Sequence, residues 1–501
     1  MREMIIDRLK KIYNDGITSF YVPGHKHGRL IKDYLCGVKL ENIDFTEIDG
    51  TDNLHHAKDL IANAQNFASD YYGSESSYFL VNGTTTGILS AISAVGMYGD
   101  KILTTRDCHK SVYNAMTIND YHAVYADIDF DYEFDLSIGP NYQDYSKKLL
   151  SNKDVKAVVL TYPTYNGICY DIKKFIDLAH IYKIPVIIDE AHGAHFKMSD
   201  LLPESSLDYG ADIVVQSTHK MLPAFTQSSM LHYKSILLEK ESLENYLRIY
   251  QSSSPSYMLL ASIDIAVDIS EKHGSILVDD YTQKLKKFYS TIDFYYFKNV
   301  NYIIAKKHNV IVDPFKINIA LSENNIDLNE LESFLRASES IQCEYSNRKV
   351  SLFVASIATI EIDLENLNRG LKNFRDMRLN ENISKSDFDE VNLEDNIKSK
   401  ISIDSENNNI ENLKIDYNGE YKKTLYMALK SKKQLIGLED SIGRISASMI
   451  TPYPPGIPYI LPGEVITKSK VDMLKEFIKS SVELEGIKKN GEKNVINVIL
   501  E

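Results

Sequence analysis

Two short apolar stretches that end in ionisable side chains constrain the fold of this chain more than any other feature. Residues 186–195 read VIIDEAHGAH, and residues 212–220 read DIVVQSTHK. β-Branched runs of this length are typical of strands buried on both faces of a parallel sheet. The carboxyl ends of such strands share one edge, where α/β proteins bind ligands. We therefore expect Asp189 and Lys220 to lie at one ligand site.

An acid and a lysine in these positions suit one cofactor. A carboxylate can keep a pyridine nitrogen protonated and a lysine can form an imine, and a pyridoxal phosphate (PLP) enzyme needs both. Lys220 directly follows an apolar strand, and partial burial there lowers its pKa and supplies the neutral amine. The alternatives are a strand-end cap or a salt-bridge partner for Asp189, and a solvated surface charge for Lys220.

The letters DEAH at 189–192 also occur in helicases, where they close a strand and hold magnesium. Such an enzyme needs a Gly-x-x-x-x-Gly-Lys-Ser/Thr loop for the phosphates, and none of the 501 residues form one. The formal net charge of −14 also opposes nucleic-acid binding, which depends on Lys and Arg neutralising phosphates. We predict no nucleic-acid partner.

The order of helical and strand patterns predicts an α/β protein of two or three domains. A mainly parallel sheet covered by helices is expected from strands at 78–81, 101–105, 123–126, 157–161, 185–189 and 212–216. Further strands are expected at 302–305, 310–312 and 350–355. The predicted divisions are an N-terminal arm (1–55), a large ligand-binding domain (56–300), a small α/β domain (301–380), a polar Asn-rich linker (381–420) and a C-terminal module (421–501).

Several absences narrow the class of protein. Residues 1–11 mix charges with apolar side chains, which predicts a short amphipathic helix instead of a signal peptide. No run of about 18 apolar residues predicts a membrane span. The four cysteines are scattered without a C-x-x-C pair, so neither a disulfide framework nor a metal site is expected. We predict a cytoplasmic protein without a membrane partner.

Further candidate ligands follow two other strands. Residues 81–87 read VNGTTTG and open a helix, so Thr84 and Thr85 can face a phosphate at its N-terminus; a plain N-cap is the alternative. His109 also follows a strand and opens a helix, where its ring can stack on a pyridine, although helix-start histidines occur without such a role. His192 follows Asp189 on the same turn and is expected to contact cofactor or substrate; a satisfied core histidine is the alternative.

Together these residues resemble the Orn/Lys/Arg decarboxylase family of fold type I PLP enzymes. The resemblance rests on ordered blocks along nearly the whole chain: FYVPGHKHG (20–28), DFTE (44–47), DNL (52–54), NGTT (82–85), TYPTYNG (161–167), DEAHGAH (189–195), STHK (217–220), SPSY (254–257) and PYPPGIP (452–458), which runs on to PGE (462–464). It implies an aspartate-aminotransferase-like large domain with smaller C-terminal α/β domains. Large family members begin with a wing domain, for which this chain has no room before Pro23.

The resemblance also implies roles for single residues. Lys220 would be the Schiff-base lysine, with Asp189 on the pyridine nitrogen and His109 stacked on the ring. His192 would lie near the scissile carboxylate. The residues implied to hold the phosphate are Thr84, Thr85, Ser217 and His219.

The implied reaction is decarboxylation of a basic amino acid, specifically L-arginine to agmatine and CO2, a step of polyamine biosynthesis. Lysine and ornithine remain alternative substrates. An aminotransferase or lyase of the same fold would need an arginine to grip the substrate carboxylate, whereas the blocks carry histidines. A PLP-binding scaffold without turnover is a further alternative, which the intact set of Asp189, His192 and Lys220 disfavours.

Two expectations concern subunits and substrate. Residues 252–255 resemble the family's hydroxyl-rich loop that reaches a neighbour's phosphate, so Ser253 is expected to donate across a homodimer or a dimer of dimers; the family often has Thr-Ser-Pro where this chain has Ser253-Ser254-Pro255. A cationic substrate side chain needs an anionic partner. Glu464, just after the proline-rich turn, is the expected partner, with a cap on the helix beginning near Lys468 as the alternative.

Overall fold

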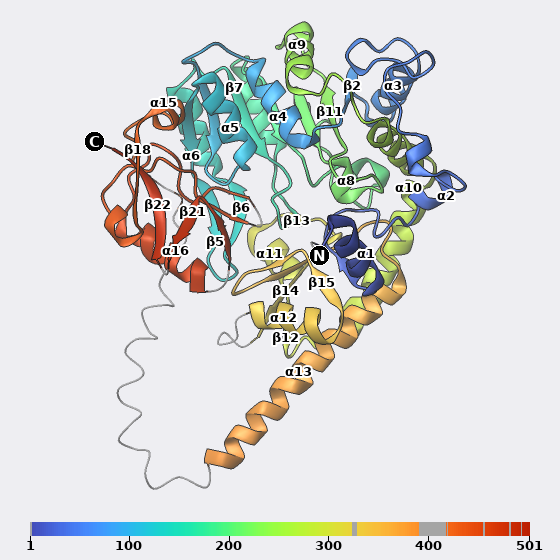
Figure 1. Ribbon diagram of the computed structural model, residues 1–501, viewed down its shortest axis with the longest axis vertical. Coiled ribbons are helices and arrows are strands. Elements are labelled where there is room, and N and C mark those ends of the chain that lie inside the picture. The colour runs from blue at the N-terminus through green and yellow to red at the C-terminus, as the bar shows by residue number, and fades with distance from the viewer. Residues whose placement is uncertain are drawn as a thin grey trace.

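A seven-stranded sheet forms the centre of the protein (Figure 1). The computed structural model describes residues 3–322, 328–389, 417, 419–453, 456–479, 482–491 and 493–500, and of 381–389 it describes the backbone only. In spatial order the strands are β2 (Ser76–Leu80), β11 (Ser229–Tyr233), β10 (Ile213–Gln216), β9 (Val186–Asp189), β7 (Ala157–Thr161), β3 (Lys101–Thr105) and β4 (His122–Ala126). All run parallel except β11, which is antiparallel to both of its neighbours. The predicted mainly parallel sheet is confirmed.

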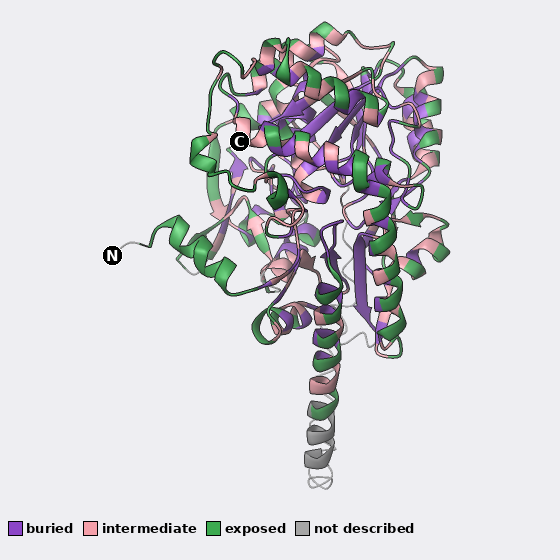
Figure 2. Cartoon of the chain, turned by 90° about the vertical axis from the view of Figure 1, so that its right-hand side faces the viewer, coloured by how far each residue is buried: buried purple, intermediate pink, exposed green. Residues whose placement is uncertain are grey.

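Helices cover both faces of this sheet because its side chains alternate between two apolar layers. On β7, Val158 and Leu160 belong to one buried cluster, whereas Ala157 and Val159 belong to the other. The first layer contains α3 (Leu60–Tyr72), α6 (Tyr142–Ser151), α7 (Lys173–Ile181) and α10 (Tyr257–Thr291). The second contains α4 (Gly83–Ser93), α5 (Lys110–Asn119) and α9 (Lys240–Tyr250). Figure 2 shows the buried strands between these more exposed helices.

The antiparallel strand β11 is the main element that the sequence pattern does not predict. Its apolar side chains are interrupted by Ser229 and His232, yet all five of its residues are buried. His232 bonds Ser77 Oγ through Nδ1 at 2.8 Å and Gln216 Oε1 through Nε2 at 3.1 Å. Buried polar groups are tolerated when they have such partners, and these partners come from neighbouring strands.

A second, antiparallel sheet lies below the large one in Figure 1. Its order is β12 (Phe297–Asn299), β14 (Lys316–Leu321), β17 (Ser351–Val354) and β16 (Tyr345–Ser346). It is accompanied by α11 (Val300–His308), α12 (Leu328–Ser338) and the long α13 (Glu361–Asp389). The strand expected at 350–355 is confirmed by β17. The strand expected at 302–305 is wrong: these residues belong to α11, which begins where the Asn299 side chain accepts the Tyr302 N–H at 3.1 Å.

The N-terminal segment is tied to this second sheet by a short parallel pair. Strand β1 (Thr18–Phe20) runs alongside β15 (Ile341–Cys343). The helix expected near the N-terminus is confirmed as α1 (Ile5–Asn14), which has no buried residue and projects from the body of the protein (Figure 2). Within the described part of the chain, no helix has the length and apolar character needed to cross a bilayer.

The C-terminal module packs against the large domain beside the carboxyl end of β3. It contains a three-stranded sheet, a two-stranded ribbon and two helices: β18 (Lys433–Gly437), β22 (Lys493–Ile499), β21 (Ile487–Asn490), β19 (Thr451–Tyr453), β20 (Glu483–Glu485), α15 (Leu425–Lys430) and α16 (Lys468–Lys479). Arg106, just after β3, donates to the carbonyls of Tyr417, Pro458 and Tyr459 at 3.0, 3.4 and 3.3 Å. Residues 390–416 and 418 of the predicted linker, and 454–455 of the predicted turn, lie outside the described residues.

Candidate active site

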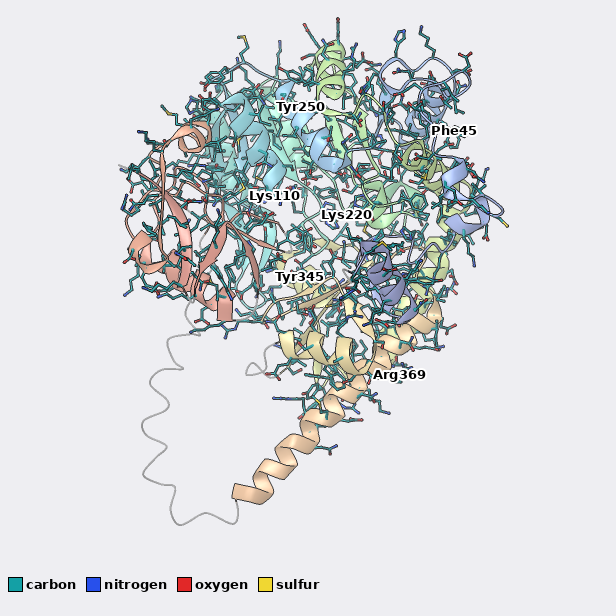
Figure 3. The ribbon with its side chains drawn as sticks, in the orientation of Figure 1. Phe45, Lys110, Lys220, Tyr250, Tyr345 and Arg369 are labelled. Atoms are coloured by element: carbon teal, nitrogen blue, oxygen red, sulfur yellow. The ribbon has the colours of Figure 1, made fainter. Side chains whose placement is uncertain are left out.

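A cavity of about 590 Å³ opens at the carboxyl edge of the large sheet. It lies between the two sheets, where Lys220 comes from the large domain and Tyr345 from the region below it (Figure 3). Eight of the ten residues predicted for the site line this cavity: Thr84, Thr85, His109, Asp189, His192, Ser217, His219 and Lys220. Segments more than 100 residues apart in the sequence are therefore brought to one place by the parallel strands.

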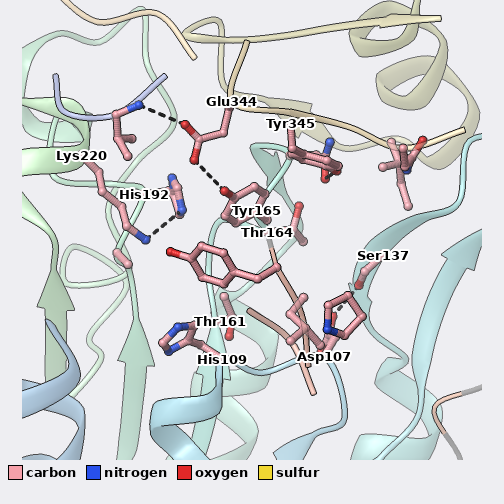
Figure 4. Close-up of a pocket in the computed structure, with 18 of the residues that line it drawn as sticks. Asp107, His109, Ser137, Thr161, Thr164, Tyr165, His192, Lys220, Glu344 and Tyr345 are labelled. Carbon is pink, nitrogen blue, oxygen red and sulfur yellow. Dashed lines mark hydrogen bonds between the residues drawn. The ribbon is translucent and has the colours of Figure 1, made fainter. Parts of the chain in front are cut away.

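Lys220 follows β10 on a single helical turn, α8 (Thr218–Met221). Its Nζ lies 3.1 Å from Nε2 of His192 (Figure 4). Burial lowers the pKa of Lys220, and the negative charges of Asp189 and Glu344 oppose that shift. A larger fraction of this amine is consequently uncharged at a given pH than of an ordinary surface lysine, which makes it a better nucleophile.

Asp189 ends the neighbouring strand β9 and is buried. One carboxylate oxygen accepts the Ala191 N–H at 3.2 Å. Burial raises the pKa of Asp189, and the charge of Lys220 opposes the shift. A buried carboxylate of this kind is costly unless a cation faces it. A protonated nitrogen on a ligand in the cavity would meet that need.

His109 is the N-cap of α5, and its Nδ1 accepts the Ser111 N–H at 3.2 Å. Burial, followed by the charges of Lys220 and Lys110, lowers the pKa of His109 to about 3. Behind the ring lies the C-terminal module: an added Cβ at Gly456 would come within 3.3 Å of the imidazole. The neutral ring thus lies between the C-terminal module and the cavity, where it is available to stack on an aromatic ligand.

Another part of the cavity wall is a cup of hydroxyls and backbone amides at the N-terminus of α4. Thr84 Oγ1 lies 2.5 Å from Ser217 Oγ and 2.9 Å from Ser229 Oγ. His219 Nδ1 lies 2.8 Å from the Ser228 carbonyl, and burial lowers the pKa of His219 to about 4. Free N–H groups and the positive end of an 11-residue helix favour an anion such as phosphate.

Three further residues, two in the cavity lining and one behind His192, were not assigned roles from the sequence. Tyr165 packs edge-on against the His192 ring, 4.9 Å between centroids. Its hydroxyl donates to Glu344 Oε1 at 2.6 Å, while Glu344 Oε2 accepts the Val22 N–H at 3.0 Å (Figure 4). Lys316 Nζ lies 2.7 Å from His192 Nδ1. Tyr165 belongs to the TYPTYNG block, whereas nothing in the local sequence distinguishes Glu344 or Lys316.

Two predicted site residues lie elsewhere. Ser253 is exposed and does not line the cavity. Glu464 is fully buried, where it forms an ion pair with Lys470, lies 3.7 Å from the Arg106 guanidinium and accepts the Leu461 N–H at 2.9 Å. The predicted substrate contact at Glu464 is at odds with this placement, because a carboxylate surrounded by protein on all sides cannot reach a substrate.

Among the described residues that line the cavity, acidic side chains outnumber basic ones. Among the described residues that line it, Lys220 is the single lysine and there is no arginine. Six carboxylates line the same space: Asp107, Asp135, Asp189, Glu332, Glu344 and Glu483. Asp135 is paired with Lys349 at 3.0 Å, whereas Glu332 forms a hydrogen bond with the Cys343 thiol. The described residues contain no group of three or more potential ligands placed to hold a metal ion.

Comparison with known proteins gives concordant matches. The family model of the Orn/Lys/Arg decarboxylase major domain matches residues 5–319, and that of the C-terminal domain matches residues 407–492. The uncharacterized protein YaaO of Bacillus subtilis (strain 168) is 35% identical over 487 residues, 96% of each chain. The arginine decarboxylase of the same organism is 28% identical over 485 residues, 95% of this chain and 94% of that enzyme.

The fold has a close counterpart among solved structures. The crystal structure of the Francisella novicida lysine decarboxylase LdcF superposes with a TM-score of 0.76 at 23% identity, covering 95% of this chain and 78% of that one. The predicted fold, that of fold type I PLP-dependent enzymes, is confirmed.

Proposed function

The chain belongs to the Orn/Lys/Arg decarboxylase family of PLP-dependent enzymes, and from that premise we propose that it converts L-arginine to agmatine and CO2. The observation that carries the proposal is the charge of the cavity, whose described lining offers acids to a cationic side chain and no arginine to a carboxylate. The full-length similarity to an arginine decarboxylase supports this choice of substrate.

The residues in the cavity fit PLP. The buried carboxylate of Asp189 matches a protonated ring nitrogen, the neutral His109 ring offers a stacking surface, and the start of α4 offers a phosphate cup. Lys220 supplies the amine for the aldehyde carbon. When bound, the cofactor supplies a cationic ring that stabilises the electron pair left at Cα after CO2 departs.

The side chains of this enzyme then have separate tasks. Asp189 keeps the ring nitrogen protonated, and His109 fixes the plane of the ring. The hydroxyls of Thr84, Thr85 and Ser217, with His219, bind the phosphate. Lys220 lies within hydrogen-bond distance of His192, so its amine, once protonated and oriented by that ring, can return a proton to Cα.

For the distal guanidinium we propose Glu332 and Glu483 in place of Glu464. Glu332 lies on α12 and Glu483 on β20, so they reach the cavity from the small and C-terminal parts of the chain. Both carboxylates line the cavity, whose described lining holds Lys220 as its single lysine and no arginine, so each can face a cation that enters. A guanidinium can bind a carboxylate through two parallel hydrogen bonds, whereas an ammonium binds as a point charge.

The test is a panel of arginine, lysine and ornithine with the PLP-loaded enzyme, monitored for CO2 and for keto-acid products. We expect CO2 release from arginine with the highest kcat/KM, and none from Lys220→Ala. Glu332→Gln and Glu483→Gln should raise KM for arginine about tenfold or more, the loss of one charge-assisted hydrogen bond. Preference for lysine or ornithine would overturn the substrate assignment, and keto-acid product would favour an aminotransferase. Tight PLP binding without any product would favour a scaffold.

We also propose that the enzyme is a homodimer, or a dimer of dimers, whose subunits complete one another's sites. Ser253 is exposed beside the start of α10, where it is available to donate to a phosphate bound in a second copy. Lys220→Ala and Ser253→Asp subunits should each be weakly active alone. Mixed after subunit exchange, they should regain up to a quarter of wild-type activity, because one hybrid site retains both native residues. Proven exchange without any gain would contradict shared sites.

A further inference from the structure

Lys316 is a buried lysine that does not line the active-site cavity. It begins β14, and its relative exposure is 0%. Its Nζ ends 2.7 Å from Nδ1 of His192, on the side of the ring away from Lys220. The chain makes room for its stem at Gly167, where an added Cβ would fall 2.5 Å from Lys316 Cγ. Burying the ammonium group of a lysine costs free energy, so the buried position of Lys316 suggests that the side chain has a function.

The two hydrogen-bond partners of His192 restrict which of its ring nitrogens carries the proton. A neutral imidazole has one N–H and one lone pair, and here an amine faces each nitrogen: Lys316 at Nδ1 and Lys220 at Nε2. If Lys316 donates to Nδ1, then Nε2 carries the proton and must meet a lone pair on Lys220. Lys220 is then an uncharged amine, the form that attacks an aldehyde carbon. In the opposite arrangement Nε2 would be the acceptor, and Lys220 could then donate to it either as an ammonium or as an uncharged amine, so nothing would hold it in the reactive form.

We propose that Lys316 is a positioning residue that donates to Nδ1 of His192, keeping this histidine uncharged with its Nε2–H directed into the active site. The inference deepens the proposed decarboxylase function and rests on it only for its consequence in catalysis. The hydrogen-bond arrangement itself is a property of the protein without cofactor.

The charges around both groups are consistent with this arrangement. Burial, the largest cause, lowers the pKa of His192 well below its ordinary value, and any positive charge on Lys220, Lys316, His219 or His195 lowers it further. The pKa of Lys316 is lowered by burial to about 8, while Asp313 and Glu344 favour its charged form.

The remaining neighbours of the His192 ring do not supply a counter-charge. Tyr165 contributes only the edge of its ring, and its hydroxyl is committed to Glu344. Asp189 lies before His192 on the same turn and lines the cavity, where it faces Lys220. No acid is hydrogen-bonded to either His192 nitrogen among the described residues.

A neutral His192 has a consequence for the proposed reaction. An imidazolium beside the substrate carboxylate would stabilise the ground state, in which that group is charged, more than the transition state, in which the charge is leaving. Interactions of that kind slow the chemical step. An N–H on a neutral ring can orient the carboxylate without holding its charge, and Lys316 keeps the ring in that form.

The experiment follows the His192 ring by NMR in cofactor-free protein labelled with ¹⁵N at histidine side chains, with His192→Gln for assignment. In the wild type we expect a neutral ring with the proton on Nε2, unchanged down to the lowest pH at which the protein stays folded. In Lys316→Met, Nδ1 loses its donor, so the pKa of His192 should rise by at least about one unit, a tenfold gain in proton affinity. Lys26→Met is the matched control: Lys26 is equally buried but donates to the carbonyls of Tyr21 and Val354, and should leave His192 unchanged.

The wild-type spectrum tests the proposal even if Lys316→Met fails to fold. A wild-type His192 that is cationic, or that carries its proton on Nδ1, overturns it, as does an unchanged pKa in a folded Lys316→Met. In the PLP-loaded enzyme, Lys316→Met should show a new loss of kcat as pH falls through the raised pKa of His192, with KM little changed. Failure of the proposed function would appear as absence of CO2 from every substrate and would leave the NMR result intact.

Discussion

Neutralising Glu464 should weaken the attachment of the C-terminal module and leave substrate preference unchanged. The carboxylate is fully buried between Lys470 and Arg106, whose side chains are 2% and 4% exposed. Glu464→Gln retains an acceptor for the Leu461 N–H but leaves two buried cations without their counter-charge. Removing one partner of a buried ion pair costs about 3–5 kcal/mol. We take about 3 kcal/mol, because the amide keeps one hydrogen bond.

The loss should appear as faster amide hydrogen exchange in α16 and β22, with the strands of the large sheet as an internal reference. Because about 1.4 kcal/mol corresponds to a tenfold change in the protection factor, a loss of 3 kcal/mol should lower protection by about 100-fold or more. Glu439→Gln is the matched control, because Glu439 pairs with Lys475 in the same module but is 68% exposed, and such pairs contribute about 0–1 kcal/mol. Unchanged protection with a fall in kcat/KM for arginine alone would refute the reasoning and return Glu464 to the substrate site.

Three further predictions concern the cofactor. Gly456→Ala places a methyl group 3.3 Å from the His109 ring on a residue with a φ of +82°, so the PLP dissociation constant, followed by absorbance, should rise about fivefold or more. Because burial lowers the pKa of Lys220, the rate of PLP capture by cofactor-free enzyme should rise with pH and level off well below pH 10.5; a plateau at the pH of free lysine would contradict this. Asp189→Asn should retain PLP but lower kcat about 100- to 1000-fold, the usual effect of removing one preorganised electrostatic partner, and an unchanged kcat would exclude a role for the carboxylate.

The sequence predicts which residues gather in the cavity at the carboxyl edge of the large sheet, because their positions depend on short-range patterns. Asp189 and Lys220 each follow an apolar run long enough to identify a buried strand, and parallel strands place their carboxyl ends together. Thr84 and His109 follow the same rule, since each lies where a strand gives way to a helix. Local sequence and sheet geometry are sufficient for such residues.

Residues that reach the site through tertiary packing could not be predicted in this way. Lys316 is 124 positions from His192, and at the start of an apolar strand it is indistinguishable from a lysine that faces solvent. Glu464 illustrates the opposite error: the prolines nearby fix the backbone, but they do not determine whether a side chain points toward the cavity or the core. The missed strand β11 has the same origin, because the partners of His232 lie on neighbouring strands.

The charged groups of the cavity suit binding of the substrate's side chain, whereas its neutral groups suit cleavage of the bond to the carboxylate. Burial lowers the pKa values of His109, His192 and His219, so the imidazoles of the cavity are neutral at physiological pH. A basic amino acid would meet carboxylates at its side-chain end, while its own carboxylate would meet uncharged groups and the single lysine of the described lining. Binding energy gained at the substrate's side chain can hold its carboxylate among groups that stabilise the negative charge poorly. Loss of CO2 removes this poorly stabilised negative charge. Transamination retains the carboxylate, so the same surroundings do not favour it.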